Sequence, residues 1–210
     1  MKVLLVNGSP HKNGCTYTAL EEIQKTLLEE GIDSDIFWLG TQPISGCIAC
    51  GYCAKHEGCA INDKVNEFAA LAKEADGFVF GSPVHYAGLS GALTSFMDRL
   101  FYSIDKLALC LKPAAGIVSA RRGGNTAAFD QVNKYFTISQ MPVISSQYWN
   151  MVHGFTPDDV KKDLEGLQTM RTLARNMAWF LKCKQAGEAA GVPMPQKEKR
   201  VGTHFIMDKD

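Results

Sequence analysis

The chain has 210 residues, of which 46% are hydrophobic, and this is enough for one domain with a full core. Lys and Arg number 22, as do Asp and Glu, and no run of like charge indicates a nucleic-acid or polybasic membrane role. The apolar run near the N-terminus is too short for a signal peptide and no stretch is long enough to span a bilayer, so a cytoplasmic protein without membrane contact is expected.

Strands and helices are predicted to alternate along most of the chain. Continuous apolar runs indicate strands buried on both faces of a sheet, and apolar residues at helical spacing indicate the helices between them. The predicted strands cover 3–6, 35–39, 77–81, 114–119 and 143–148, and the predicted helices cover about 18–30, 65–75, 89–102, 126–136 and 156–181.

This alternation is typical of an α/β fold with a doubly wound parallel sheet of five strands. We expect one domain over residues 1–190, with a cysteine-rich insertion at 40–63 after the second strand. Residues 191–210 are expected to form a C-terminal arm, and its strand-like segment 203–207 needs a surface to lie on, such as that of a second subunit.

The loop over residues 7–16, after the first strand, has the features of a phosphate site. It opens a helix, where unpaired backbone amides and the helix dipole favour an anion. Neither G-x-G-x-x-G nor the P-loop pattern is present, so an ordinary turn with a helix cap stays the alternative. The candidate contacts are two glycines that allow close approach, two hydroxyl donors and one cation: Gly8, Gly14, Ser9, Thr16 and Lys12.

The loops after the third and fourth strands carry groups that suit a planar ring. In such sheets, ligands bind beyond the carboxyl ends of the strands, so the three loops are expected to converge. In the loop over 81–91, Pro83 stiffens the strand exit, and His85 and Tyr86 can lie against a ring or pack for stability.

The loop over 119–125 offers backbone amides and two cations. The amides near Gly123 and Gly124 can meet ring carbonyl oxygens, and Arg121 or Arg122 can stabilise negative charge on a ring. Most exposed arginine pairs simply face solvent, and that alternative is favoured for at least one of these two.

Four of the seven cysteines form a C-x2-C-x2-C-x5-C pattern: Cys47, Cys50, Cys53 and Cys59. Without a secretion signal the thiols are expected to stay reduced, and the three scattered cysteines are expected to act as small apolar side chains. The four can ligate an iron–sulfur cluster, bind tetrahedral zinc, or stand as free or redox-active thiols. The compact triplet is a poor match to the separated knuckles of a zinc site, and Ala60 stands where bacterial ferredoxins have proline.

The sequence GSPHKNGCT at 8–16, GSPVHYAGLSGAL at 81–93 and FMDRL at 96–100 together resemble the NADPH-dependent FMN reductase family of flavodoxin-like proteins. The cysteine set is similar to that of the branch called iron–sulfur flavoproteins. The similarity runs from the first strand to about the fifth. It implies a flavodoxin-like fold, bound FMN, and a homodimer or homotetramer with the flavin near a subunit interface.

The resemblance also implies which residues bind each group. The family more often has Asn at position 15, so Cys15 is expected to contribute its backbone amide, and His85 stands where a larger aromatic is common. The four cysteines would ligate a 4Fe–4S cluster near the flavin. The implied contacts are Ser9, Lys12, Asn13, Gly14, Cys15 and Thr16 for the phosphate, Pro83, Val84, His85, Tyr86 and Gly88 for the isoalloxazine, and Ser119, Ala120, Arg121 and Gly124 for its pyrimidine edge.

The function expected from this resemblance is FMN-dependent oxidation of NAD(P)H, with electrons passed to a small-molecule or protein acceptor, directly or through the cluster. No catalytic residue is named, because the chemistry belongs to the cofactor. One alternative is a non-enzymatic electron carrier that accepts electrons from a ferredoxin-type protein, since no dinucleotide fingerprint is present. Another is a flavin-free interaction protein on the same fold.

Overall fold

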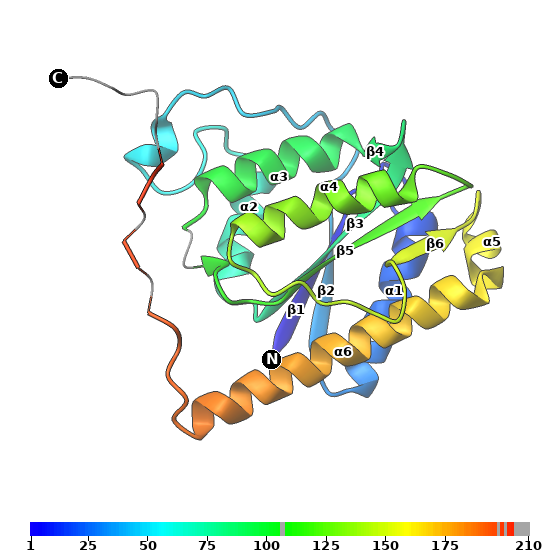
Figure 1. The fold of residues 1–210 in the computed structure, drawn as a ribbon. Helices are drawn as coiled ribbons and strands as arrows, with labels where there is room; N and C mark the ends of the chain where they lie inside the picture. The colour runs from blue at the N-terminus through cyan, green and yellow to red at the C-terminus, as the bar shows by residue number, and fades with distance from the viewer. Residues whose placement is uncertain (106–107, 197, 200, 204–210) are drawn as a thin grey trace.

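The structure, a computed structural model, describes residues 1–105, 108–196, 198–199 and 201–203. At its centre lies a parallel sheet with helices on both faces (Figure 1). A short strand, β4 (Gly88–Leu89), pairs antiparallel with the third strand, so the described residues form six strands where five were predicted. The parallel strands, in spatial order, are β2 (Asp33–Trp38), β1 (Lys2–Asn7), β3 (Gly77–His85), β5 (Ala114–Ala120) and β6 (Met151–His153).

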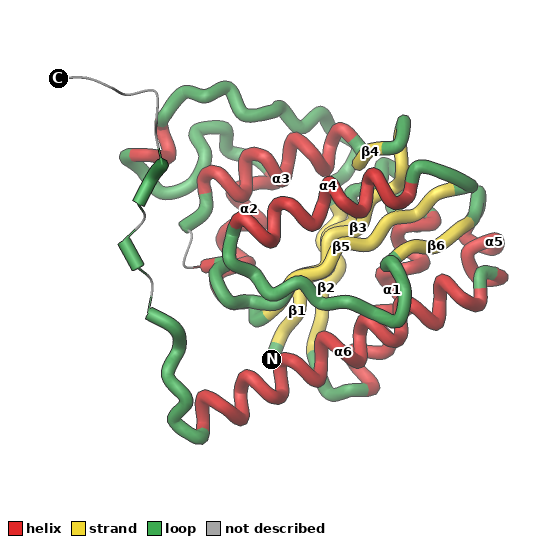
Figure 2. The backbone as a smooth tube through the Cα atoms, viewed as in Figure 1, coloured by secondary structure: helices red, strands yellow, loops and turns green. Residues whose placement is uncertain are grey.

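The helices form one layer on each face of the sheet, which confirms the predicted doubly wound architecture (Figure 2). Each face of the sheet carries a hydrophobic core. The first core, on one face, contains Phe68, Phe80 and Phe96, and the second core, on the opposite face, contains Leu5 and Ile23. Helices α2 (Lys64–Lys73), α3 (Gly91–Ser103) and α4 (Asn125–Ile138) pack on the first core, and α1 (Cys15–Glu29), α5 (Pro157–Lys162) and α6 (Leu164–Ala189) pack on the second.

The strand order switches direction between β1 and β3, at the carboxyl ends of these strands. The chain passes from β1 to β2 on one side, then crosses back over β1 to reach β3 on the other. Ligands in open α/β sheets bind where the order switches in this way. The loop after β1 and the loop after β3 therefore flank the place where a ligand is expected.

The fifth parallel strand lies later than predicted. The sequence places it at 143–148, whereas Val143 forms only an isolated bridge to Ala114 and the paired strand is β6, Met151–His153. The side chain of Ser146 donates to Asn150 Oδ1 at 2.7 Å, and Asn150 Nδ2 donates to the Gly116 carbonyl at 3.2 Å. Side-chain hydrogen bonds of this kind compete with a strand ladder, and here they replace it with an irregular loop.

The last predicted helix is divided in two. Its start is as predicted: Thr156 caps α5, and its side chain and that of Asp159 form a reciprocal capping box. The division falls at Asp163, whose ψ of 78° is not helical and whose carboxylate accepts from the amides of Gly166 and His153. Helix α6 begins at the next residue and runs to Ala189.

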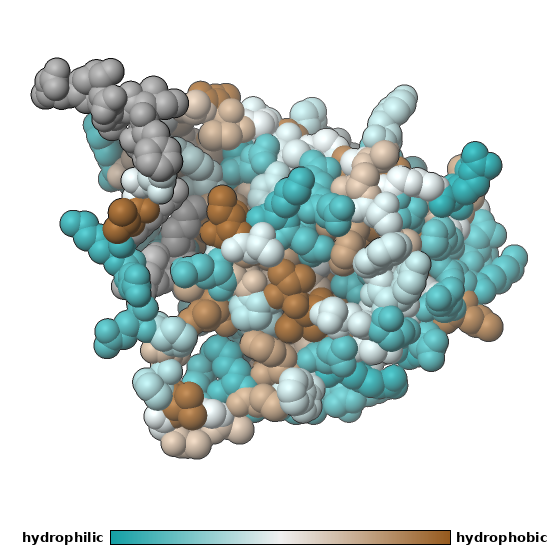
Figure 3. All heavy atoms as spheres, viewed as in Figure 1, coloured by the Kyte–Doolittle hydropathy of each residue, from teal (hydrophilic) through white to brown (hydrophobic). Residues whose placement is uncertain are grey.

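Beyond α6 the described residues form no helix or strand. Gly191, with a φ of 82°, ends the helix. The predicted strand at 203–207 lies outside the described residues except for Thr203. On the face seen in Figure 3, hydrophobic side chains lie in scattered groups among polar ones. In the described part of the chain, no helix is both long and apolar enough to cross a membrane.

Candidate functional site

The loop after β1 is held in shape by two side chains from the strands below it. Asn7, which is fully buried, accepts from the Ser9 amide through Oδ1 and donates to the Lys12 carbonyl through Nδ2, both at 3.0 Å. Trp38, at the end of β2, donates to the Ser9 carbonyl at 2.8 Å, and the Lys12 ammonium lies 5.7 Å from its ring centre. The sequence did not reveal these roles of Asn7 and Trp38. For Asn7 the available signal was a polar residue at the end of an otherwise apolar strand.

Helix α1 begins at this loop with open backbone amides. Its N-cap is Gly14, and no side chain among the described residues caps it. By contrast, α2, α3 and α5 are capped by the side chains of Asp63, Ser90 and Thr156. Uncapped amides at a helix start, together with the helix dipole, favour an anion such as a phosphate.

The three predicted loops converge at one edge of the sheet. The Gly8 amide donates to the Gly81 carbonyl at 2.9 Å, and the Ser90 hydroxyl donates to the Gly8 carbonyl at 2.7 Å. Buried Thr16 and Ser119 share a hydrogen bond of 2.8 Å between their hydroxyl oxygens. The loop after β1 is thus joined to β3 and to the N-cap of α3, and the start of α1 is joined to the end of β5.

The loop after β5 also packs against the hairpin between β3 and β4. Tyr86 and Ala87 form a two-residue turn with φ values of 50° and 60°, and the Tyr86 side chain is fully exposed. Gly124 has a φ of 90°, and a Cβ there would lie 2.8 Å from the Cα of Ala87. This position therefore requires glycine, both for its left-handed backbone and for the close approach.

The structure gathers the predicted flavin contacts at this edge but in different environments. Burial raises the pKa of the Cys15 thiol, and its Sγ lies 3.6 Å from the Gly154 carbonyl, so the neutral side chain points away from the loop amides. Which of these residues touch a cofactor stays a prediction. Those with buried side chains are Ser9, Thr16, Ser119 and Ala120, those partly buried are Gly14, Cys15, Pro83, Val84, Gly88 and Gly124, and those exposed are Lys12, Asn13, His85, Tyr86 and Arg121.

A polar group that the sequence did not indicate stands next to the predicted pyrimidine edge. His153 pairs in register with Ala120, its Nε2 lies 3.4 Å from Asn125 Nδ2, and its Nδ1 lies 3.6 Å from Asp163 Oδ2. The misplaced fifth strand hid this residue, because a strand at 143–148 leaves His153 in a connecting loop.

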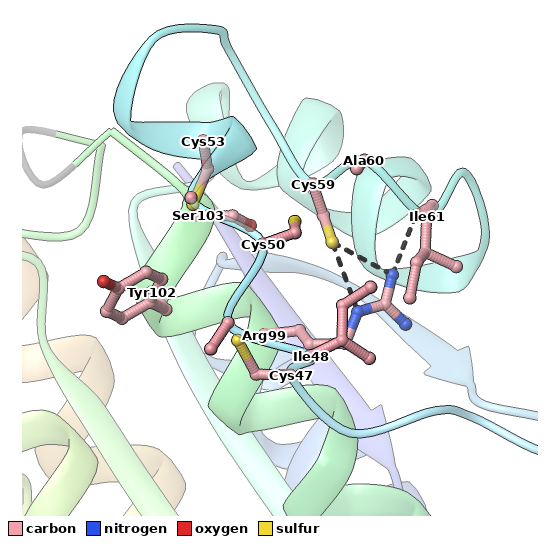
Figure 4. A pocket seen from close by; sticks show the side chains of 12 residues that line it. Cys47, Ile48, Cys50, Cys53, Cys59, Ala60, Ile61, Arg99, Tyr102 and Ser103 are labelled. Atoms are coloured by element: carbon pink, nitrogen blue, oxygen red, sulfur yellow. Dashed lines mark hydrogen bonds between the residues drawn. The ribbon is translucent and has the colours of Figure 1, made fainter.

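All four clustered cysteines line one small cavity, with a volume of about 20 Å³ (Figure 4). They lie on a loop that contains one short 3₁₀ helix, η1 (Tyr52–Ala54), and turns at Ala49 and Gly51 with φ values of 52° and 70°. Side chains of α3 form the opposite wall: Arg99, Tyr102 and Ser103. All seven cysteines of the chain lie within the described residues, and all are free thiols.

Arg99 is the buried group that fixes this loop. Its side chain is 1% exposed, and its guanidinium binds both carboxylate oxygens of Asp63, at 2.6 and 3.0 Å. It also donates to the carbonyls of Ser45 and Ile61 and, from Nε and Nη2, to Cys59 Sγ at 3.3 Å. Burial alone would lower the pKa of Arg99, but the hydrogen bonds to Asp63 and Cys59 raise it above its ordinary value. Both ends of the insertion are thereby tied to α3.

Cys59 is also clamped through its backbone. Asn66, on α2, accepts from the Cys59 amide and donates to the Cys59 carbonyl, both at 2.8 Å. Cys47 and Cys50, in contrast, are exposed on the irregular part of the loop. One cysteine of the four is therefore held rigidly, and the rest of the motif lies on a loop with few fixed contacts.

The donor chemistry of the cavity fits an anionic iron–sulfur group. Four thiols and a guanidinium line it, together with a Ser103 hydroxyl that is buried and has no hydrogen-bond partner among the described residues. As placed, no set of three or more Cys, His, Asp or Glu side chains in the described residues converges on one metal position. The four cysteines line a small cavity, and the loop has to rearrange for all four sulfur atoms to become ligands of one cluster.

Comparison with known proteins identifies the family. The NADPH-dependent FMN reductase family matches residues 1–156. An iron–sulfur flavoprotein of Methanocaldococcus jannaschii is 32% identical over 193 residues, which cover 87% of this chain and 98% of that protein.

Solved structures agree on the fold alone. A flavone reductase superposes with a TM-score of 0.69 at 18% identity, covering 88% of this chain and 64% of that one. A flavodoxin from the domain Archaea gives 0.56 at 18% identity, covering 87% and 99% of the two chains, so the flavodoxin-like fold is confirmed. The chain belongs to the NADPH-dependent FMN reductase family, in its iron–sulfur flavoprotein branch.

Proposed function

We propose that this FMN flavoprotein oxidoreductase takes electrons from NAD(P)H and passes them to a small-molecule acceptor or a ferredoxin-type protein, with a 4Fe–4S cluster in the cysteine cavity as the one-electron outlet. The family description supports the FMN and the nicotinamide donor, and the names of the relatives support the cluster. The observation that carries the proposal is a pair of neighbouring sites, one with open amides at a sheet edge and one lined by four thiols.

Bound FMN would supply the redox chemistry, since it can accept a hydride and release electrons in pairs or singly. The role of the protein is to bind the FMN and orient it. The amides that begin α1 hold the phosphate, and Lys12 adds a positive charge beside them. The turn at Tyr86 and the start of α4 at Gly124 lie against each other and limit where a ring can sit.

One of the four cysteines, Cys59, is held in place without a bound cluster. Arg99 and Asn66 hold Cys59 in place, so a cluster would be bound by one fixed thiol and by three thiols on the rest of the loop. The guanidinium also supplies the positive charge that an anionic cluster needs in a partly buried place.

The electron donor is tested by anaerobic addition of NADPH or NADH to the yellow protein. Bleaching within minutes is expected from at least one of them, followed by return of the colour when a quinone or free flavin is added. If reduced ferredoxin bleaches the protein and neither nicotinamide does, the electron-carrier alternative replaces the reductase. A colourless preparation that binds no added FMN contradicts both.

The cluster is tested by iron and acid-labile sulfide analysis of protein purified without oxygen. Four iron and four sulfide per chain are expected for a 4Fe–4S cluster. Near-zero iron leaves the flavin reductase in place but removes the cluster, and zinc without sulfide favours a structural metal site.

We also propose that the chain acts as a homodimer or homotetramer. Several aromatic side chains are at least half exposed, among them Trp149, Phe155 and Trp179, and such groups are enriched at interfaces. Light scattering of the holoprotein measures the state directly, and a monomer at micromolar concentration contradicts the proposal.

A further inference from the structure

The wall of the cysteine cavity that faces the loop is one face of α3. Arg99 and Ser103 are four residues apart on this helix, so their side chains lie one above the other on the same face. Both line the cavity, and each brings hydrogen-bond donors to it (Figure 4). Neither residue lies on the cysteine loop itself.

The donors of Arg99 are directed at a sulfur atom as well as at a carboxylate. Nε and Nη2 both lie 3.3 Å from Cys59 Sγ, while Nη1 and Nη2 bind Asp63. Asp63 caps α2 and accepts from the Val65 amide, so part of its charge is already compensated by the helix start. Nη1 and Nη2 also donate to the Ser45 and Ile61 carbonyls, so Nε is the donor that is directed at the sulfur alone.

Ser103 provides an independent indication. Its residue is 9% exposed, and its Oγ has no hydrogen-bond partner in the described part of the chain. Buried hydroxyl groups without a partner are rare in folded proteins. Because this one lines the cysteine cavity, it is free to donate to an acceptor atom there, such as a cluster sulfur.

We propose that Arg99 and Ser103 set the reduction potential of the cluster through hydrogen bonds to its sulfur atoms, Arg99 through Cys59 Sγ and Ser103 through its unpaired hydroxyl. Hydrogen bonds and positive charge at the sulfurs stabilise the reduced state, which carries one more electron, and so raise the potential. Arg99 is a positioning residue, since it acts through Cys59. The inference rests on the proposed cluster and adds which residues make that cluster easier to reduce.

The test is a redox titration of the anaerobic holoprotein, with dithionite as reductant and the reduced cluster followed by electron paramagnetic resonance. Ser103→Ala is expected to lower the ratio of reduced to oxidised cluster about tenfold at a given ambient potential, which is about 59 mV for a one-electron couple. Arg99→Lys keeps the positive charge but loses the planar guanidinium with its several N–H donors, and the reduction potential is expected to shift in the same direction. Ser95→Ala, on the same helix but outside the cavity lining, serves as the matched control and keeps the wild-type potential.

The outcomes distinguish failure of the proposed cluster from failure of the proposed hydrogen bonds. If the wild-type protein contains no iron and sulfide, both the cluster and this inference are wrong. Wild-type protein with a full cluster, together with an unchanged potential in Ser103→Ala, overturns the inference and leaves the cluster standing. If Arg99→Lys does not fold, Ser103→Ala decides alone, because it removes one unpaired oxygen atom and breaks no hydrogen bond between described residues.

Discussion

The flavin site and the cysteine cavity are supported in different ways. At the predicted flavin site, the segments that follow β1 contact the buried strands beside them, as Gly8 contacts Gly81 in β3 and Thr16 contacts Ser119 in β5. The cysteine loop has almost no regular structure and is held by two side chains from the helices below it, Arg99 and Asn66. A site supported by several strands is expected to weaken gradually under mutation, whereas a loop held by two side chains is expected to lose its structure when one of them is removed.

Helix α3 joins the two sites. Its N-cap, Ser90, donates to the Gly8 carbonyl in the loop after β1, and Arg99, nine residues further along, binds the cysteine loop. At 1.5 Å of rise per residue, the two anchor points are about 14 Å apart along the helix axis. Substitutions that spare α3 should therefore affect one site and leave the other unchanged.

The largest effect is expected from loss of a clustered thiol. Cys50→Ala removes one of the four thiols that line the cavity and, in the proposed function, one cluster ligand, so iron and sulfide content should fall to near zero while FMN stays bound. Cys183→Ala, which removes an exposed thiol on α6, is the matched control and should retain the wild-type iron content. Full iron in Cys50→Ala would show that this cysteine is not a ligand.

The next largest effect is expected from loss of the ion pair between Asp63 and Arg99, which holds the cysteine loop on α3. Asp63→Asn leaves the 1% exposed Arg99 without its carboxylate, and loss of one partner of such a pair costs about 3 kcal/mol. The free energy of unfolding in urea should fall by this amount. Lys64→Gln breaks an exposed ion pair with Glu67 and should cost less than about 1 kcal/mol. Equal losses in the two variants would contradict the role of Arg99 as the anchor.

The sequence predicted the convergence of the segments that follow β1, β3 and β5, but not the contacts that hold the cysteine loop, and the reason is physical. Strands β1, β3 and β5 are continuous apolar runs, and the loops that follow them are placed by the sheet, so their convergence could be predicted. The role of Arg99 could not, because it depends on an insertion 40 residues earlier folding back over α3. The fifth strand was misplaced because Ser146 and Asn150 hydrogen-bond locally, which no apolar pattern reveals.

At the flavin site a backbone substitution should have an intermediate effect. Gly124→Ala places a Cβ 2.8 Å from the Ala87 Cα and forces a side chain into the left-handed region, at a cost of about 2 kcal/mol. The dissociation constant of FMN, measured by fluorescence, should rise about tenfold or more. Gly123→Ala meets nothing within 4 Å and should bind FMN as the wild type does. The iron content of both variants should be unchanged, which tests the independence of the two sites.

The smallest effect tests whether the flavin loops support one another. Thr16→Val keeps the shape of the side chain but removes its hydroxyl, which leaves the buried Ser119 hydroxyl without its partner at 2.8 Å. A loss of about 1 kcal/mol is expected, seen as a several-fold rise in the dissociation constant of FMN. Ser119→Ala should cost a similar amount. The double variant should cost less than the sum, because neither polar atom is then left unpaired. Strictly additive losses would mean that each hydroxyl contacts the cofactor separately, and that the hydrogen bond between them does not hold the two loops together.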